Sequence, residues 1–293
     1  MHRDVAALID RQERWAGPLG EQAQGILARL LHEGGRRPIK DVLNGTWLGH
    51  PVHPAVTDVP VGAMTLAALF DLTGRDSAAD AAVAVGIAGM VASAATGASD
   101  AVDAYGRVRT HATVHATLMS ASATVYLLSG LLRLGPRVLR PLARLLGYAG
   151  YGVMTAGAYV GGDLTYGIGS QVDRHAFEAT GAKWRSLDVS DVPAGTLVKA
   201  KAGSDAIVLY RAADGSPVSA FHALCSHMGG PLDKGTIVDG CVECPWHQSR
   251  FDLGSGQVRQ GPAVYDQPRF EVRETAEHGL EARRMPTGGN GRA

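Results

Sequence analysis

The chain has 293 residues, and its 28 lysines and arginines balance 28 aspartates and glutamates, so the formal net charge is zero. A chain of this length accommodates two domains. Balanced charge provides no basic field, so we expect no nucleic-acid partner. Three cysteines are too few for a disulfide scaffold and fit a reducing compartment.

Residues 1–41 are charged and helix-prone, and they lack the apolar core of a signal peptide. Within them, residues 21–33 place a short apolar stripe on one helical face, formed by Ala23, Ile26, Leu27, Leu30 and Leu31. Such a stripe can lie along a membrane surface or pack on the protein's own body. We therefore expect an amphipathic, cytoplasmic N-terminal segment.

Four apolar segments follow, at about 55–73, 80–98, 113–132 and 142–162, and each approaches the roughly 20 residues that cross a bilayer as a helix. Gly89, Ser93 and Gly97 have the four-residue spacing that lets helices pack closely in lipid. A soluble alanine-rich bundle is the alternative, but polar residues are too few for four wetted helices. The sequence predicts a four-helix transmembrane bundle over residues 42–165, in contact with membrane lipid.

The distribution of basic residues gives only a weak indication of how this bundle is oriented in the membrane. Four spans place both chain ends on one side, where six basic residues lie near span ends against five on the other side. The lack of an export signal favours cytoplasmic termini. We expect a multi-pass protein of the inner cell membrane, with its C-terminal domain on the cytoplasmic side.

Ionisable residues in or near the spans are costly and suggest function: His53, Asp58, Asp100, His111, His115 and Asp163. His53 and His115 could be the axial ligands of a haem b. The same histidines with Asp58 or Asp163 could hold a quinone or a metal, or all these groups could form a hydrogen-bonded network that fixes helix packing. The haem interpretation needs two histidines at similar depth, whereas His53 lies at a span entrance, and His50 fits an interfacial position.

From residue 166 to 183 the composition is polar, which predicts a linker. After it, residues 206–210 and 269–274 are strand-like, and Asp214-Gly215, Asp239-Gly240 and His278-Gly279 mark hairpin turns. The sequence predicts an all-β domain over residues 184–285 and a disordered tail over 286–293.

Two short motifs dominate the β domain, Cys225-Ser226-His227 and Cys244-Pro245-Trp246-His247. Two thiolates suit one iron and two imidazoles suit a second, which is the mixed ligation of a Rieske [2Fe–2S] centre. A tetrahedral zinc site is the alternative for two Cys and two His. Zinc fingers usually pair Cys with Cys and His with His, whereas each motif here carries one of each.

The surroundings of these motifs supply supporting groups. Met228 and Gly229 continue the first loop, where glycine lets backbone N–H groups approach a sulfur. Ser249 follows the second loop and could donate a hydroxyl hydrogen bond to a sulfur. The stretch Gly261-Pro262-Ala263 is similar to the proline loop that covers the cluster of Rieske proteins.

Together, these motifs resemble the Rieske 2Fe–2S ferredoxin-like family over about residues 184–285. The resemblance implies a Rieske (ISP-like) fold and a cluster held by Cys225 and Cys244 on the inner iron and by His227 and His247 on the solvent-facing iron. It also implies a supporting shell of Met228, Gly229, Trp246, Ser249 and Pro262. The activity implied is one-electron transfer between a donor and an acceptor that the sequence does not name.

Departures from the family pattern predict a low redox potential. Quinol-oxidising Rieske proteins join an extra cysteine in each loop as a disulfide, but Gly230 and Trp246 stand at those places here. They also tend to carry tyrosine where this chain has Phe251, so a hydrogen bond that raises the potential is missing. We expect the low end of the range of about −150 to +300 mV. Cys241, the third cysteine, is predicted to be a small buried hydrophobe.

The membrane part has a resemblance of its own. The stretch LGHPVHPA at residues 48–55 and the stretch YVGGD at 159–163 are similar to an uncharacterised bacterial four-helix membrane family over about 45–172, which is sometimes fused to a Rieske domain. The whole chain is therefore expected to be a membrane-anchored Rieske electron carrier of the oxidoreductase type. The alternatives are a membrane reductase that relays electrons to haem b or quinone, a ferredoxin component of an oxygenase system, and a redox sensor.

Overall fold

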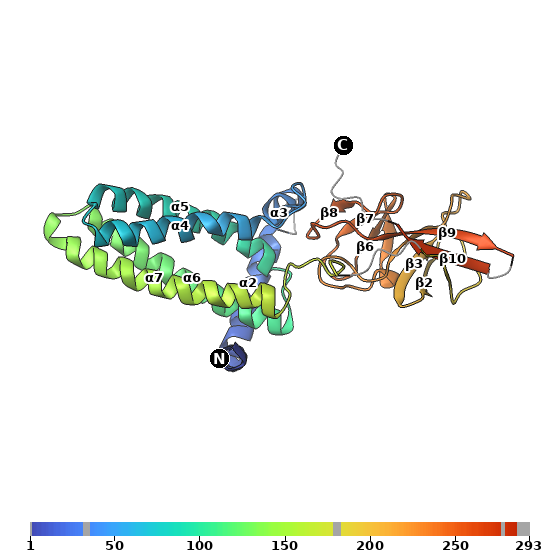
Figure 1. Ribbon diagram of the computed structural model, residues 1–293, viewed down its shortest axis with the longest axis horizontal. Coiled ribbons are helices and arrows are strands. Elements are labelled where there is room, and N and C mark those ends of the chain that lie inside the picture. Colours follow the sequence, from blue (N-terminus) through green and yellow to red (C-terminus); the bar gives the residue numbers. More distant parts are fainter. Residues whose placement is uncertain (1, 32–35, 178–182, 277–278, 286–293) are drawn as a thin grey trace. The chain divides into compact units, whose positions relative to one another are not determined.

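The computed structural model describes residues 2–31, 36–177, 183–276 and 279–285, and the side chains of these from residue 5 onward. The chain forms two compact units (Figure 1). The helical unit comprises residues 1–43 and 52–170, and the β unit comprises residues 44–51 and 171–293. An all-helical part thus precedes an all-β part, as the sequence predicts.

The helical unit contains these α-helices: α1 (His2–Asp10), α2 (Glu13–Leu31), α3 (Arg37–Asn44), α4 (Val52–Leu72), α5 (Asp76–Ala101), α6 (Gly106–Arg133) and α7 (Arg140–Gly162). The last four correspond to the four predicted apolar segments. They run side by side in Figure 1, and each packs against its neighbours in the order α4, α5, α6, α7 and back to α4. A short 3-10 turn (Arg137–Leu139) precedes α7, and a π-helical turn (Asp163–Gly167) follows it.

Among the described helices, α4, α5 and α6 are long and apolar enough to cross a membrane. The fourth expected span is α7, which has 23 residues but is not one of these three. Its first turns carry Arg140 and Arg144, which lower the mean hydropathy of the helix. Membrane crossing by α7 therefore stays a prediction.

The bundle is held together differently in its middle and at one end. In the middle, the buried side chains of Met64, Met90, Tyr126 and Met154 form one apolar cluster. At the end where α4 leads into α5 and α6 into α7, the Arg133 guanidinium forms a buried ion pair with Asp71 and also binds Asp80, with Nη1 and Oδ1 3.1 Å apart. A charge that is buried with its partner is tolerated, whereas losing one partner costs about 3–5 kcal/mol.

Helix α2 packs on the body of the helical unit. The Gln24 side-chain amide donates to the carbonyl oxygen of Ala101 at 2.7 Å, and Gly20 lies against Thr113 of α6. Ile26 and Leu30, from the predicted apolar stripe, stay exposed. The contacts with the body thus come from residues beside the stripe, whereas Ala23 is exposed as well and Leu27 and Leu31 are half-buried.

The β unit has two antiparallel sheets. The first has the order β1-β10-β9-β4-β3-β2 and the second the order β5-β6-β7-β8. Their strands are β1 (Arg185–Ser186), β2 (Leu197–Ala202), β3 (Asp205–Tyr210), β4 (Ser219–His222), β5 (Thr236–Val238), β6 (Cys241–Glu243), β7 (Arg250–Asp252), β8 (Val258–Gln260), β9 (Arg269–Thr275) and β10 (Gly279–Arg284).

These strands test the sequence expectations directly. The predicted strands at 206–210 and 269–274 are confirmed as β3 and β9. Asp239-Gly240 joins β5 to β6, and both residues have positive φ (49° and 74°), as a tight hairpin turn of that sequence requires. Asp214-Gly215 lies in the connection between β3 and β4, while His278 lies outside the described residues.

Two apolar clusters fill the β unit. One is built on the larger sheet around Ile207, Leu209 and Phe270. The other includes Val208, Phe221 and Phe251 and also contains Cys225 and Cys244. The two motif cysteines, which are far apart in sequence, therefore share one core.

Candidate metal centre

The first cysteine loop follows β4 and closes on itself through its backbone. The Cys225 N–H donates to the Gly230 carbonyl at 2.8 Å, and the Gly229 N–H donates to the Cys225 carbonyl at 2.9 Å. Gly229 has a φ of 78°, a conformation that glycine adopts without steric cost. The loop thus curls around its cysteine.

The second loop, between β6 and β7, has the same pattern of backbone hydrogen bonds. The Cys244 N–H donates to the Ser249 carbonyl at 2.9 Å, and the Gln248 N–H donates to the Cys244 carbonyl at 3.0 Å. Gln248, four residues after its cysteine like Gly229, also has positive φ, at 61°. Two loops of different sequence therefore present their cysteines in the same local geometry.

The two sulfurs are buried, hydrogen-bonded to each other and surrounded by donors. In each loop, the N–H groups two and three residues after the cysteine point at its sulfur: those of His227 and Met228 at Cys225, and those of Trp246 and His247 at Cys244. The contact with Cys225 lowers the pKa of Cys244 to about 7, whereas the same contact and then burial raise the pKa of Cys225. Adjacent sulfurs that accept backbone N–H bonds fit the cysteine end of an iron–sulfur cluster.

Gly230 provides the space next to these sulfurs. A Cβ placed on this residue would lie 2.6 Å from the Cys244 Sγ and 3.3 Å from the Trp246 ring. Cys225, Cys241 and Cys244 are all free thiols. Cys241 is 6% exposed in β6, which confirms the prediction that it is buried.

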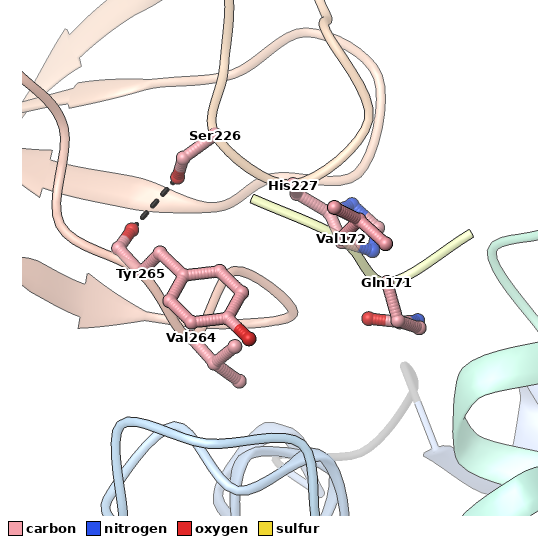
Figure 2. A pocket seen from close by; sticks show the side chains of 6 residues that line it. All are labelled: Gln171, Val172, Ser226, His227, Val264 and Tyr265. Atoms are coloured by element: carbon pink, nitrogen blue, oxygen red, sulfur yellow. Dashed lines mark hydrogen bonds between the residues drawn. The ribbon is translucent and has the colours of Figure 1, made fainter. Parts of the chain in front are cut away.

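The two imidazoles differ in exposure. The ring centroids of His227 and His247 are 5.1 Å apart, with the ring planes at 84°. His247 is half-buried, but His227 is only 4% exposed. The two rings are expected to hold the solvent-facing iron, but the His227 ring itself is buried. The His227 side chain lies in a narrow recess whose other lining residues cover it (Figure 2): Gln171, Val172, Ser226, Val264 and Tyr265.

A buried glutamine that the sequence reasoning missed fixes the first loop. The Gln267 side chain accepts from the Ser226 N–H at 3.0 Å and donates to the carbonyls of His222 (2.8 Å) and Leu224 (2.6 Å). It is 2% exposed. A single glutamine before Pro268 belongs to no recognisable motif, so no pattern in the sequence signals this role.

Part of the predicted linker also holds this loop. His175 donates through Nε2 to the Leu224 carbonyl at 2.8 Å, and its ring lies 4.3 Å from that of His222. The Arg174 N–H donates to the Ser226 carbonyl at 3.4 Å. Arg174 and His175 thus tie this part of the predicted linker to the first cysteine loop, whereas residues 178–182 of that linker lie outside the described part of the chain.

The proline loop lies beside the second cysteine loop. The Ala263 N–H donates to the Ser249 hydroxyl oxygen at 3.0 Å, and the peptide bond before Pro262 is cis. Because Ser249 accepts this bond, its hydroxyl hydrogen stays available, and the expected bond to a sulfur stays a prediction. Thr46, from the short segment 44–51, donates to the Ala263 carbonyl at 3.4 Å.

The family model for the Rieske [2Fe-2S] domain matches residues 183–271. The ferredoxin subunit of anthranilate 1,2-dioxygenase from Burkholderia cepacia is 38% identical over 90 residues, which are 29% of this chain and 78% of that protein. The chain belongs to the Rieske [2Fe–2S] family. Membership implies a Rieske-type [2Fe–2S] cluster and electron transfer, and the sulfur geometry described above fits that cluster.

Other similar proteins differ widely in how much of their own length the match covers. The ferredoxin component of the naphthalene 1,2-dioxygenase/salicylate 5-hydroxylase systems from Ralstonia sp is 29% identical over 29% of this chain and 80% of that protein. Apoptosis-inducing factor 3 of Mus musculus is 39% identical over 56 residues, which are only 9% of that protein. The ferredoxin of carbazole 1,9a-dioxygenase from Nocardioides aromaticivorans IC177 aligns with 36% of this chain and 99% of its own, at 26% identity and a TM-score of 0.31. The family match lies wholly within the β unit of this Rieske protein.

In the helical unit, the structure separates the candidate residues into two groups. His53 and His115 meet, with ring centroids 6.3 Å apart. Asp58, expected to join them, is exposed, and no contact among the described residues links it to the pair. His111 instead lies between Asp10 and Asp163, at 3.0 Å and 3.2 Å from their carboxylate oxygens.

Proposed function

We propose that this Rieske protein is a membrane-anchored carrier that performs one-electron transfer. Cys225 and Cys244 would hold the inner iron, and His227 and His247 the outer iron. The observation that carries the proposal is the pair of matched cysteine loops, which bring two buried thiols together with two neighbouring imidazoles. When bound, the cluster would take up and release a single electron without transferring atoms.

The residues around the cluster have distinct tasks in this proposal. Backbone N–H groups of both loops point at the sulfurs and offset negative charge, which favours the reduced state. His247 is the more exposed imidazole, so redox partners would approach its side of the domain. Its imidazole could also bind a proton when an electron arrives.

The surroundings support a potential at the low end of the Rieske range. The positions of Gly230 and Trp246 leave no bridge between the loops. Phe251, at 1% exposure in the same core as both cysteines, brings no hydroxyl to the sulfurs. Fewer hydrogen bonds to the cluster sulfurs leave the reduced state less stabilised.

The membrane anchor is supported by the three helices that are long and apolar enough to span a bilayer. We propose that residues 42–165 form a multi-pass domain in the inner membrane, in contact with lipid, and that the Rieske domain at 184–285 is cytoplasmic. After membranes are washed with alkaline carbonate, the protein should stay in the membrane pellet. Its release into the wash would rule out this anchoring.

Ligand variants test the cluster assignment. Each of Cys225→Ser, Cys244→Ser, His227→Ala and His247→Ala is expected to abolish the Rieske electron paramagnetic resonance (EPR) signal of the reduced, full-length protein. Cys241→Ser is the matched control and should keep the signal, because Cys241 lies outside both loops. An unchanged signal in the His247 variant would overturn the assignment.

A second candidate function is that of the ferredoxin component of an oxygenase system. Two of the relatives described above are ferredoxins of aromatic-ring dioxygenases. The test is turnover with a flavin-dependent reductase and the terminal oxygenase of such a system. Product formation that depends on this protein would support the second role, and cluster reduction without product would leave the carrier proposal in place.

A further inference from the structure

Two histidines meet inside the helical unit although they come from different helix pairs. His53 lies at the start of α4 and packs on α5, and His115 lies on α6 and packs on α7. Their ring centroids are 6.3 Å apart and their planes are at 86°. Helix α6 begins nine residues before His115, and this extension brings the ring level with the start of α4. The objection that His53 and His115 lie at different depths is thereby removed.

Each ring is held through Nδ1 by a backbone carbonyl, and the His53 Nδ1 also lies 3.2 Å from the Thr96 hydroxyl oxygen. The Nδ1 of His53 hydrogen-bonds to the Ser93 carbonyl at 3.0 Å, and the Nδ1 of His115 hydrogen-bonds to the Gly157 carbonyl at 2.8 Å. A carbonyl acceptor fixes the proton of a neutral ring on Nδ1 and leaves the lone pair on Nε2, as in histidines that bind metals. Among the described residues, neither Nε2 has a hydrogen-bond partner.

A glycine makes room for each ring. A Cβ on Gly97 would lie 2.8 Å from the His53 ring, and a Cβ on Gly161 would lie 3.0 Å from the His115 ring. In both cases, the carbonyl that accepts from the histidine lies four residues before the glycine. The helix pairs α4–α5 and α6–α7 thus place a carbonyl and a glycine against their histidine at the same spacing.

This equivalence continues along the bundle. Met64 lies eleven residues after His53 and faces Gly86, which lies eleven residues before Gly97. In the same way, Tyr126 lies eleven residues after His115 and faces Gly150, which lies eleven residues before Gly161. All these contacts occur between helices of one pair. The two pairs are therefore structural repeats, and His53 and His115 are equivalent positions that face each other across the repeat boundary.

We propose that His53 and His115 are the two axial ligands of one haem b iron. A metal–nitrogen bond of about 2.0–2.1 Å, with roughly 1.1 Å from a ring nitrogen to its centroid, places imidazoles on opposite sides of one metal about 6.3 Å apart. The observed separation is 6.3 Å. Cofactor sites of helical bundles are built in this way, from side chains on facing helices.

The chemistry of the histidine pair favours a porphyrin over other occupants. Two histidines supply two nitrogens, and the macrocycle supplies the four that complete the coordination of iron. His53 and His115 belong to α4 and α6, which are long and apolar enough to cross a membrane, and apolar surroundings suit the macrocycle. The site lies in the helical unit, so the proposal stands independently of the cluster ligands in the β unit.

The test is haem binding by the full-length protein, purified in detergent from cells supplied with 5-aminolevulinate and then titrated with haemin. We expect one haem per chain by the pyridine haemochrome assay, with the sharp α-band of a six-coordinate b-type haem after dithionite reduction. His53→Ala and His115→Ala should each lose that band. His50→Ala, and Gly152→Ala at a helical glycine with open space, should keep it.

Two further variants separate ligation from folding. Gly97→Ala should reduce haem occupancy without removing a ligand, because its new methyl group displaces the His53 ring. His115→Met keeps a side chain that binds iron and should raise the haem potential, as methionine ligation does. Neither effect follows from a merely structural role for the pair.

Three results would overturn the proposal: no haem bound by the wild-type protein after titration, an unchanged α-band in both alanine variants, or a bound quinone or bare metal ion in place of haem. The Rieske EPR signal, recorded on the same samples, reports on the β unit separately. Failure of the haem proposal and failure of the cluster assignment are thus distinguished.

Discussion

Gly230 lies where any side chain would meet the sulfur of Cys244. Gly230→Ala adds a Cβ at 2.6 Å from this Sγ, inside a closed loop. We expect the variant to lose most of its cluster, because overpacking of about 1–3 kcal/mol displaces a ligand. Iron and sulfide analysis measures the loss. Gly254→Ala is the control, since its Cβ would approach only a carboxylate oxygen, at 3.4 Å. Full occupancy in the Gly230 variant would contradict the proposed packing.

Phe251 is the residue at which the potential can be tuned. It is 1% exposed and shares a core with both cysteines. Phe251→Tyr brings a hydroxyl near the sulfurs, and a hydrogen bond that favours the reduced state by about 1 kcal/mol would raise the potential by roughly 40 mV. Protein-film voltammetry measures the change. A lowered potential would count against the hydrogen-bond argument.

Gln267 is expected to matter more than its position in the sequence suggests. Gln267→Leu leaves the Ser226 N–H and two carbonyls without their buried partner, which should destabilise the β unit by about 2–4 kcal/mol. Gln260→Leu removes one exposed bond, to the Gln248 carbonyl at 2.7 Å, and should cost about 1 kcal/mol or less. Chemical denaturation of both variants gives the comparison. An equal loss of stability in the two variants would contradict the role assigned to Gln267.

At this scale, the sequence predicted the residue types of the site but not their supports. Cys225 and Cys244 could be found because thiolates and imidazoles at short spacing have few other uses. The support from Gln267 and the burial of His227 depend on segments distant in sequence, residues 267 and 171–172. No local pattern reports contacts of this kind.

The turn after β7 makes one element of the β unit sensitive to acid. The Asp252 Oδ1 accepts from the N–H groups of Gly254 (3.1 Å) and Ser255 (2.7 Å) and from the Ser255 hydroxyl (2.8 Å). Burial raises the pKa of Asp252, but these bonds and Arg259 outweigh it, so the folded-state pKa lies below the ordinary value of 3.8. A lowered pKa contributes stability above 3.8 that is lost as the pH falls through the folded-state value.

Removing the Asp252 charge is expected to lower the stability of the protein by an amount that depends on pH. Asp252→Asn should destabilise the protein by about 1 kcal/mol at neutral pH, since a neutral amide accepts more weakly than a carboxylate. Below pH 3.8 the difference between variant and wild type should shrink towards zero. Denaturation curves at neutral and acidic pH measure it. A difference that stays constant with pH would contradict the assigned role.

Among the elements, the long helices were predicted best. Uninterrupted apolar composition predicted the ends of α4, α5 and α7 to within four residues, whereas α6 begins seven residues before the segment predicted for it. Less could be predicted about α2, because the same apolar stripe suits a membrane surface and a protein surface, and the structure shows Gln24 bonded to α5 while Ile26 is exposed. Amphipathicity indicates that a face is covered but does not identify the partner.

For the whole molecule, composition separated a helical part from a β part, and the structure has these two units. The repeat of the two helix pairs was not predicted, because it depends on which glycine faces which side chain. Four-residue glycine spacing indicates close packing but gives no register. The meeting of His53 and His115 follows from that register.

The most direct test of the account is pulsed EPR on the dithionite-reduced, full-length protein. We expect a Rieske-type signal that integrates to about one spin per chain, with hyperfine couplings to two histidine nitrogens. Labelling of histidine with nitrogen-15 should change both couplings, and His247→Ala should remove the signal. A signal without histidine coupling, or a purified protein whose bound metal is zinc, would contradict the assignment of Cys225, His227, Cys244 and His247 as cluster ligands.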